Sequence, residues 1–230
     1  MQEAPQKNWI VGITGASGMP YALTLIDHLE QCCDEVHVVF SEAAFRVLHE
    51  EQNVKLKSSR LSAETLIGRP SDQIFFYDNK DIGAAIASGS FLTEGMVIVP
   101  CSMGTLGAVA NGLCQNLIHR AADVVLKEGR RLVIVPRETP LSSLHLENML
   151  RLSKMQTRIV PAMPGFYQRP ECIQDLVDMM VMKILDQMGL HRELVPRWGR
   201  DKGDNKDSGG RRTLSSSKSL NLVSLPSTHD

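Results

Sequence analysis

Short runs of β-branched and other apolar residues recur along the chain and alternate with longer amphipathic stretches. Most of these runs are apolar throughout, as expected of strands buried on both faces of a parallel sheet. Such alternation is typical of βαβ units, in which a helix connects each strand to the next parallel strand. We therefore predict an α/β protein with a mostly parallel sheet. The predicted strands are residues 9–14, 35–40, 73–77, 96–100, 131–136 and 158–162.

The stretches between the strands predict helices, and residues 55–72 predict a loop with one helical turn. With 230 residues, of which 43% are hydrophobic, the chain has enough apolar material for one full α/β domain. Residues 200–230 are rich in serine and charged residues without apolar periodicity, so we expect a disordered polar tail after a single domain at 1–199. The predicted helices are 19–31, 42–51, 103–111, 116–128, 143–155 and 171–188.

Charge and composition exclude several kinds of partner. A net charge of -1 and a pI near 6.7 give no electrostatic footprint for nucleic acid or for an anionic membrane surface. The chain has no signal-peptide pattern and no apolar run of about 18 residues, so we expect a cytoplasmic protein. Its 5 cysteines lack C-x-x-C spacing, which favours reduced thiols and no metal site.

Polar or glycine-rich residues follow five of the predicted strands. Because ligands of open parallel sheets bind beyond the carboxyl ends of the strands, we expect these segments to form one site. They are "GASG" (15–18), Ser41, "CSMGT" (101–105), "RE" (137–138) and "PGFY" (164–167).

The "GASG" turn differs from a dinucleotide-binding fingerprint. Thr14 and Gly15 fit the short-chain dehydrogenase pattern, but Pro20 and Ala22 stand near the positions of its later glycines. That class also carries a Tyr-x-x-x-Lys pair, and no tyrosine of this chain has a lysine four residues after it. A helix start beside Ser17 can still hold one phosphate, so a mononucleotide is favoured, and a purely structural turn is the alternative.

Several charged residues are candidates for phosphate binding or proton transfer. Arg120 and Lys127 are seven residues apart, so they lie on one stripe of a predicted helix and can bind a phosphate together. The alternative is that both pair with Asp123 between them in a salt-bridge ladder. Glu138 follows a strand, where a buried carboxylate can exchange a proton, or it can simply neutralise Arg137. Considered by itself, Lys183 on the last predicted helix is expected to be a surface lysine.

Taken together, these motifs resemble the flavin prenyltransferases of the UbiX type over roughly residues 8–199. The resemblance implies a Rossmann-like, three-layer flavoprotein that forms a homo-oligomer, typically a dodecamer, with sites at subunit junctions. It also implies transfer of the dimethylallyl group of dimethylallyl phosphate to N5 and C6 of reduced FMN, without a metal. The prenylated FMN would serve a UbiD-type decarboxylase. The motifs are "GASG" with Ser41, "IASGSFLTEGMVIVPCSMGTL", "LIHRAADVVLKEGRRLVIVPRETPLSSLHLENML", "PAMPGFYQRP" and "PRWG".

The resemblance also implies roles for individual residues. Ser17 and Glu138 correspond to the pair that transfers protons, and Glu51 and Trp198 to less central positions of the site. Some of the phosphate-side cations are expected to reach a neighbouring subunit. The FMN-binding positions are Gly15, Ala16, Ser17, Ser41, Ser102, Met103, Gly104, Thr105 and Arg137, and the prenyl-phosphate positions are Arg120, Lys127, Tyr167 and Lys183.

Two positions depart from the family pattern. Lys183 stands where some members have arginine, which keeps the charge but loses the bidentate fork. Ile82 stands where some members have tryptophan, so no aromatic wall is present there. The chain also has no Asp-Asp pair of the kind that holds magnesium in diphosphate-dependent prenyltransferases. Fixed lysine, arginine and tyrosine donors can hold a monophosphate without a metal.

Two other functions remain as alternatives. An FMN-dependent cysteinyl-peptide decarboxylase shares the expected fold, but it should carry P-A-S-A-N-T where this chain has "PCSMGT". A non-catalytic flavin carrier is the other alternative.

Overall fold

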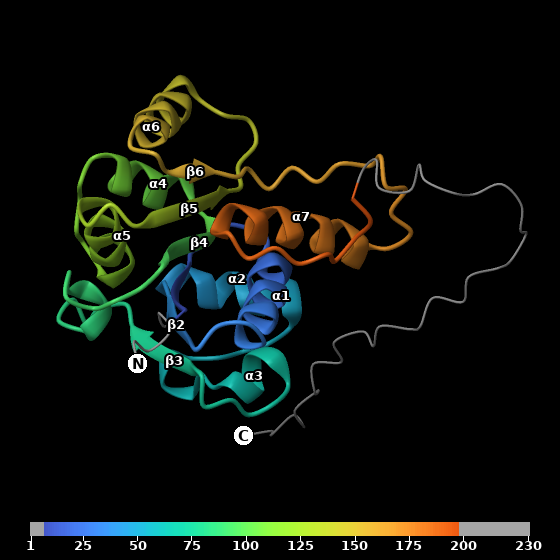
Figure 1. Ribbon diagram of the computed structural model, residues 1–230, viewed down its shortest axis with the longest axis horizontal. Helices are drawn as coiled ribbons and strands as arrows, with labels where there is room; N and C mark the ends of the chain where they lie inside the picture. The colour runs from blue at the N-terminus through green and yellow to red at the C-terminus, as the bar shows by residue number, and fades with distance from the viewer. Residues whose placement is uncertain (1–6, 198–230) are drawn as a thin grey trace, which may run out of the picture.

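A computed structural model describes residues 7–197, in which six parallel strands form one sheet in the order β3-β2-β1-β4-β5-β6 (Figure 1). Neighbouring strands pair in parallel throughout, as predicted, because helices return the chain between them. The strands are β1 (Asn8–Ile13), β2 (Glu35–Phe40), β3 (Ile74–Asp78), β4 (Gly95–Cys101), β5 (Arg131–Pro136) and β6 (Arg158–Ile159).

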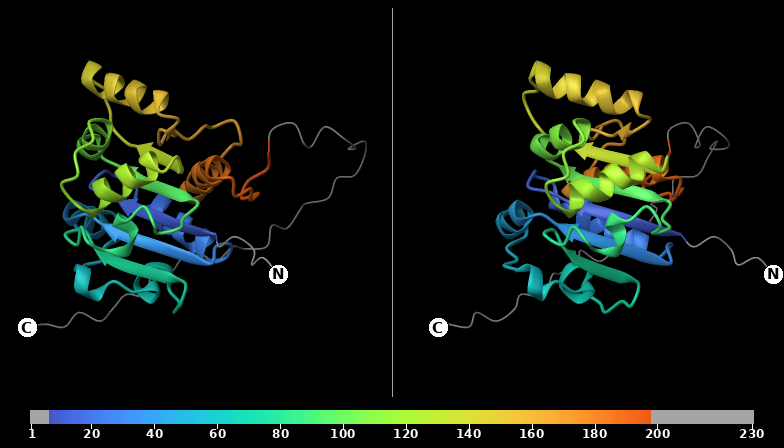
Figure 2. Two further views of the ribbon diagram at one scale, coloured as in Figure 1. Left: turned by 60° about the vertical axis from the view of Figure 1, so that its left-hand side comes forward. Right: turned by 90° about the vertical axis from the view of Figure 1, so that its left-hand side faces the viewer.

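Helices cover both faces of the sheet, which gives the three predicted layers (Figure 2). One apolar cluster lies between the sheet and α1, α2, α3 and α7, and a second lies between the sheet and η2, α4, α5 and α6. The helices are α1 (Met19–Glu30), α2 (Glu42–Gln52), η1 (Ser58–Arg60), α3 (Ala63–Ile67), η2 (Ala85–Ala87), α4 (Met103–Ala110), α5 (Leu117–Lys127), α6 (Ser143–Lys154) and α7 (Ile173–Met188).

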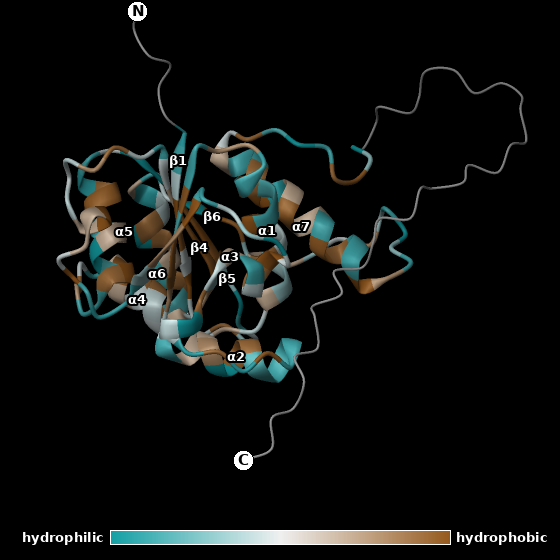
Figure 3. Cartoon of the chain, turned by 90° about the horizontal axis from the view of Figure 1, so that it is seen from below, coloured by the Kyte–Doolittle hydropathy of each residue, from teal (hydrophilic) through white to brown (hydrophobic). Residues whose placement is uncertain are grey.

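Alternation along β1 divides its side chains between the two cores. Val11 and Ile13 belong to the cluster under α1 and α7, whereas Ile10 belongs to the cluster under α4 and α5. All three are buried, so this strand is apolar on both faces. Figure 3 shows mostly hydrophobic strands between helices that carry both hydrophobic and hydrophilic residues.

The last strand is shorter than the predicted 158–162. Regular pairing ends at Ile159 because Pro161 has no N–H to donate. Val160 and Ala162 nevertheless donate to the carbonyls of Ile134 and Pro136, over 2.8 and 3.0 Å, so the chain still follows the edge of β5.

Segment 55–72 contains the short helices η1 and α3 where one helical turn was predicted. Ser62 caps α3 by accepting the N–H of Thr65, and Gly68 ends it with a left-handed φ of 72°. Trp198 and the predicted tail at 200–230 lie outside the described residues. Within residues 7–197, every helix is too short or too polar to span a membrane.

Candidate functional site

The turns that follow the strands meet at one edge of the sheet, because all the pairs are parallel. The strand order reverses at β1, which has β2 and β3 on one side and β4, β5 and β6 on the other. The turn after β1 and the turn after β4 therefore flank a topological switch point, where open α/β sheets bind their ligands. The predicted segments 15–18 and 101–105 are these two turns.

Buried Thr14 joins the two turns. Its Oγ1 donates to the carbonyl of Pro100 over 2.8 Å and accepts the N–H of Ser102 over 2.7 Å. The Thr14 N–H also donates to Pro100, over 3.2 Å. The sequence interpretation used Thr14 only to compare dehydrogenase patterns and missed this bridge. The sequence pattern that could have predicted this bridge is a hydroxyl residue at the end of an apolar strand, directly before a glycine turn.

The first N–H groups of α1 are bonded to Glu51, which comes from the last turn of α2. Its carboxylate accepts the N–H of Gly18 over 3.0 and 3.1 Å and the N–H of Met19 over 2.8 Å. The partial positive charge of a helix N-terminus stabilises such a carboxylate. The sequence suggested that this helix start holds a phosphate, but in the structure its donors are occupied by Glu51. Burial and the Glu51 charge also raise the pKa of Tyr21.

The start of α4 is open. Ser102 caps this helix through its Oγ, which accepts the N–H of Thr105 over 3.4 Å and donates to the Thr105 hydroxyl over 3.2 Å. A side chain at exposed Gly104 would meet no atom within 4 Å. Within residues 7–197, no side chain accepts the N–H of Met103 or Gly104, and the first N–H groups of a helix have no partner inside it. These donors can hold an acceptor-rich ligand.

The turn after β1 packs tightly against the start of α2. A Cβ at Gly15 would lie 2.5 Å from the Cβ of Ala43, so only glycine allows this contact. Ser41 begins α2 by accepting the N–H of Ala44 over 3.2 Å. Ala16 is buried and Ser17 is half-buried beside Gly18. The structure therefore brings the predicted Gly15 to Ser17 turn and Ser41 together at the sheet edge.

The end of β5 carries Arg137 and Glu138 to the same edge. The N–H of Arg137 donates to the carbonyl of Cys101 over 3.2 Å, which places this segment beside the turn after β4. Half-buried Glu138 accepts the N–H of Thr139 over 3.0 Å. Among the described residues no ion pair joins Arg137 to Glu138, so the predicted alternative of mutual neutralisation is not observed.

The two predicted cations of α5 do not act as a single ladder. Arg120 pairs with Asp123 over 3.1 Å, but Lys127 pairs with the neighbouring Glu128 over 2.5 Å. Lys127 is the last residue of α5, directly before the turn into β5. Its Nζ lies beside Gly89, 3.0 Å from the position that a Cβ on this glycine would occupy. Lys127 is therefore at the amino edge of its own sheet, and one chain does not bring it to the Gly15 turn.

Three further residues of the sequence prediction are exposed. Tyr167 lies in the segment between β6 and α7, Lys183 lies on α7, and Ile82 follows β3. They belong to other segments than the turns after β1 and β4, so their place in the site stays a prediction.

A cavity of about 350 Å³ lies at the opposite, amino edge of the sheet, and its lining includes Glu94, Arg130, Arg131, Thr157 and Arg158. None of the predicted site residues line this cavity, so the candidate site is the carboxyl edge of the sheet. Between residues 7 and 197, no three His, Cys, Asp or Glu side chains cluster as a metal site.

Comparison with known proteins gives consistent matches. The profile of the flavoprotein family matches residues 1–185. A protein of Halalkalibacterium halodurans named flavin prenyltransferase UbiX is 48% identical over 197 residues, which cover 86% of this chain and 96% of that protein.

Two solved structures share the fold. A dodecameric FMN-dependent UbiX-like decarboxylase from Escherichia coli O157:H7 has a TM-score of 0.74 at 44% identity, covering 83% of this chain and 98% of that one. AnUbiX (PadA1), solved in complex with FMN and dimethylallyl pyrophosphate, has a TM-score of 0.75 at 38% identity, covering 84% of this chain and 97% of that one.

Proposed function

The chain belongs to the flavoprotein family and to its UbiX-type flavin prenyltransferases, and we propose that it transfers a dimethylallyl group to reduced FMN. The donor is dimethylallyl phosphate, and the new bonds form at N5 and C6 of the flavin. The structural observation that supports this function is the open start of α4 at the switch point, beside Arg137 and Glu138.

The donors at the carboxyl edge fit FMN, whose phosphate and ring carbonyls are hydrogen-bond acceptors. Among the described residues no side chain accepts the N–H groups of Met103 and Gly104, and the space beside Gly104 is open. The hydroxyls of Ser17 and Ser41 and the Arg137 guanidinium lie on adjoining segments. Reduced FMN supplies the nucleophilic N5 and C6. The Thr14 bridge fixes the two turns relative to each other, which preorganises these donors.

Glu138 and Ser17 handle protons in the proposed reaction. Glu138 is half-buried with its carboxylate held by the Thr139 N–H, so it can accept the proton that leaves C6 when the ring closes. The Ser17 hydroxyl can donate to an oxygen of the departing phosphate. Arg120, Lys127 and Lys183 supply positive charge for that phosphate, and the Tyr167 hydroxyl supplies a further donor.

The site is completed by a second copy in this proposal. Lys127 lies at the amino edge of its own sheet, so it reaches a phosphate only in a neighbouring subunit. Helix α6, which projects from the margin of the molecule (Figure 2), buries only Leu152 and exposes Leu144, Leu146 and Leu150. Leu146 and Leu150 are four residues apart and share one face of this helix, and an exposed apolar face is typical of a protein-binding surface. We propose that the partner is another subunit of a homo-oligomer, as in a dodecamer.

The prenylated flavin is a modified cofactor, and we propose that a UbiD-type decarboxylase receives it.

Anaerobic incubation of the protein with reduced FMN and dimethylallyl phosphate, followed by mass spectrometry of the released flavin, tests the proposal. We expect a prenylated flavin, and a parallel reaction with dimethylallyl diphosphate identifies the donor. Unmodified flavin with both donors would refute the transferase. Decarboxylation of a peptide with a C-terminal cysteine would then support the peptide decarboxylase, and tight flavin binding alone would support the carrier.

A further inference from the structure

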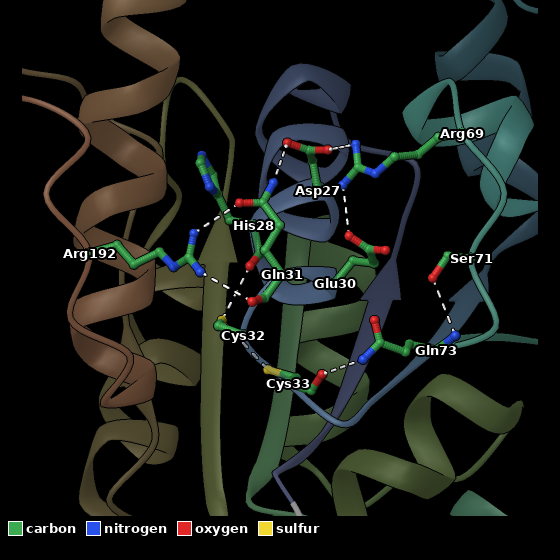
Figure 4. A network of polar contacts seen from close by, with 10 residues as sticks. All are labelled: Asp27, His28, Glu30, Gln31, Cys32, Cys33, Arg69, Ser71, Gln73 and Arg192. Carbon is green, nitrogen blue, oxygen red and sulfur yellow. Dashed lines mark hydrogen bonds and ion pairs between the residues drawn. The ribbon is translucent and has the colours of Figure 1, made fainter.

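Two adjacent cysteines lie at the end of α1 (Figure 4). Cys32 and Cys33 follow α1 and precede β2, so they lie at the amino edge of the sheet. Their sulfur atoms are 3.9 Å apart. The proposed prenyl transfer uses neither residue.

The two thiols differ in access to solvent. Cys33 is buried, with 4% of its surface exposed, whereas Cys32 is half-buried. A reagent in solution therefore has more access to Cys32 than to Cys33. The buried Cys33 can donate its S–H to the sulfur of Cys32, which stabilises a Cys32 thiolate.

A cation is fixed beside Cys32. Arg192, from the segment after α7, donates to the side-chain oxygen of Gln31 over 3.1 Å and to its main-chain carbonyl over 3.4 Å (Figure 4). The hydrogen bond from Cys33 and the charges of Arg192 and Lys7 lower the pKa of Cys32 to about 6, against the opposing effect of burial. The same hydrogen bond and burial raise the pKa of Cys33.

One contact opposes the thiolate. The Cys32 thiol donates to the carbonyl of His28 over 3.2 Å, at the negative end of the α1 dipole. Ionisation of Cys32 gives up this bond. The guanidinium of Arg192 and the S–H of Cys33 offset the loss, so removal of either group should raise the pKa of Cys32 toward that of an ordinary thiol.

We propose that Cys32 is a redox-modification site that a hydroperoxide oxidises to sulfenic acid, with Cys33 and Arg192 as its positioning residues. The Cys32 thiolate attacks the terminal peroxide oxygen, a sulfur–oxygen bond forms and the oxygen–oxygen bond breaks. Sulfur gives up two electrons, and the released alkoxide or hydroxide takes the proton that the thiol lost. A small cellular thiol then displaces water from the sulfenic acid and forms a mixed disulfide.

Cys33 is a poor partner for a disulfide with Cys32. Adjacent Cα atoms are about 3.8 Å apart across a trans peptide, which is shorter than the separation of about 4.4 Å or more found in most disulfides. The proposal therefore ends at a sulfenic acid or a mixed disulfide and leaves Cys33 as a thiol.

The pH dependence of alkylation tests the environment of Cys32. The full-length protein is treated with iodoacetamide from pH 5 to 10, and each cysteine is followed by peptide mass spectrometry. Cys114 and Cys172 serve as internal controls because both are more exposed than Cys32. We expect Cys32 to react with a midpoint near pH 6, and about tenfold faster than the controls at that pH, since the lower nucleophilicity of an acidic thiolate offsets part of its larger ionised fraction.

Variants separate the two positioning residues from a merely structural role. Cys33→Ala and Arg192→Gln should each move the Cys32 midpoint upward by at least one pH unit, and Arg192→Lys should restore much of it. Thermal unfolding of each variant checks that the fold is kept. A Cys32 midpoint equal to those of Cys114 and Cys172, or unchanged in both variants, would refute the proposed activation.

Peroxide trapping tests the chemistry itself. After a stoichiometric dose of hydrogen peroxide in the presence of dimedone, we expect the adduct on Cys32 and none in Cys32→Ser. Adducts confined to Cys114 or Cys172, or a disulfide between Cys32 and Cys33, would overturn the proposal. Both experiments are independent of prenyl transfer, so their outcome does not depend on the proposed function.

Discussion

The carboxylate of Glu51 accepts the backbone N–H of Met19 over 2.8 Å, which joins the end of α2 to the start of α1. This contact satisfies donors that a helix start otherwise exposes. It also means that an anion reaches the first turn of α1 only if Glu51 moves away.

Replacement of Glu51 by alanine should therefore have two effects. The free energy of unfolding should fall by about 1 kcal/mol, as for loss of a helix cap. Inorganic phosphate should then raise the melting temperature of the variant more than that of the parent, because the freed N–H groups can bind it. Glu50→Ala, on the exposed side of the same helix, is the matched control. Equal phosphate responses in the parent and the Glu51 variant would contradict this account.

The Thr14 bridge should be needed for both stability and flavin binding. Thr14→Val keeps the shape but leaves the buried carbonyl of Pro100 and the N–H of Ser102 without the hydroxyl, at about 1–3 kcal/mol of unfolding free energy. Thr14→Ser retains the hydroxyl and should lose much less. Chemical denaturation measures the first effect, and titration with FMN measures the second. If valine and serine are tolerated alike, the hydroxyl has no such role.

Substitution of Glu138 by glutamine should separate binding from turnover. The amide cannot accept a proton, so we expect prenyl transfer to slow by about 10²–10⁴-fold while FMN affinity changes little. Glu64→Gln, on the exposed surface of α3, should have parent-like turnover. Single-turnover kinetics with reduced FMN measures the difference. Parent-like rates in the Glu138 variant would remove this carboxylate from the mechanism.

The exposed face of α6 should hold subunits together. Leu146→Glu places a charge on this face, so we expect smaller assemblies by sedimentation velocity. Leu92→Glu makes the same substitution at an exposed leucine outside α6 and should leave the assembly intact. Prenyl transfer should fall with the assembly if Lys127 serves a neighbouring site. A dissociated variant with full activity would contradict that part of the proposal.

Buried histidines should make the protein less stable in mild acid. Burial lowers the pKa of His119, whose Nδ1 has no partner in the described part of the chain. The unfolded chain, with a histidine pKa of about 6.5, then binds the proton first as the pH falls. The His119 contribution is complete above that pH and is lost as the pH falls toward the lower folded value.

His119→Gln should therefore flatten the dependence of the unfolding free energy on pH between 7 and 5. One histidine accounts for a slope of at most about 1.4 kcal/mol per pH unit. His49→Gln, at an exposed position of α2, is the control. Urea denaturation at several pH values gives the slopes, and identical slopes for the parent and the His119 variant would argue against this assignment.

The parallel sheet and the edge at which the residues after its strands meet were predictable because their signals are local. Apolar runs such as 131–136 mark strands buried on both faces, and the residues after them, such as Arg137, reach the same edge in any parallel arrangement. Local patterns predicted β6 less well, since Pro161 limits its regular pairing but not its path along β5. The motif resemblance added the family, which the relatives confirm.

Sequence alone therefore determined the fold class, the turns that flank the switch point and the family. Tertiary structure decided which partner each polar group takes. Thr14 meets Ser102 across 88 positions of the chain, and Glu51 reaches Gly18 across 33. Such contacts depend on strand order and on where the helices pack, and no short stretch of sequence records them. The same reason places Lys127 at the far edge of its own sheet and Arg192 beside Cys32.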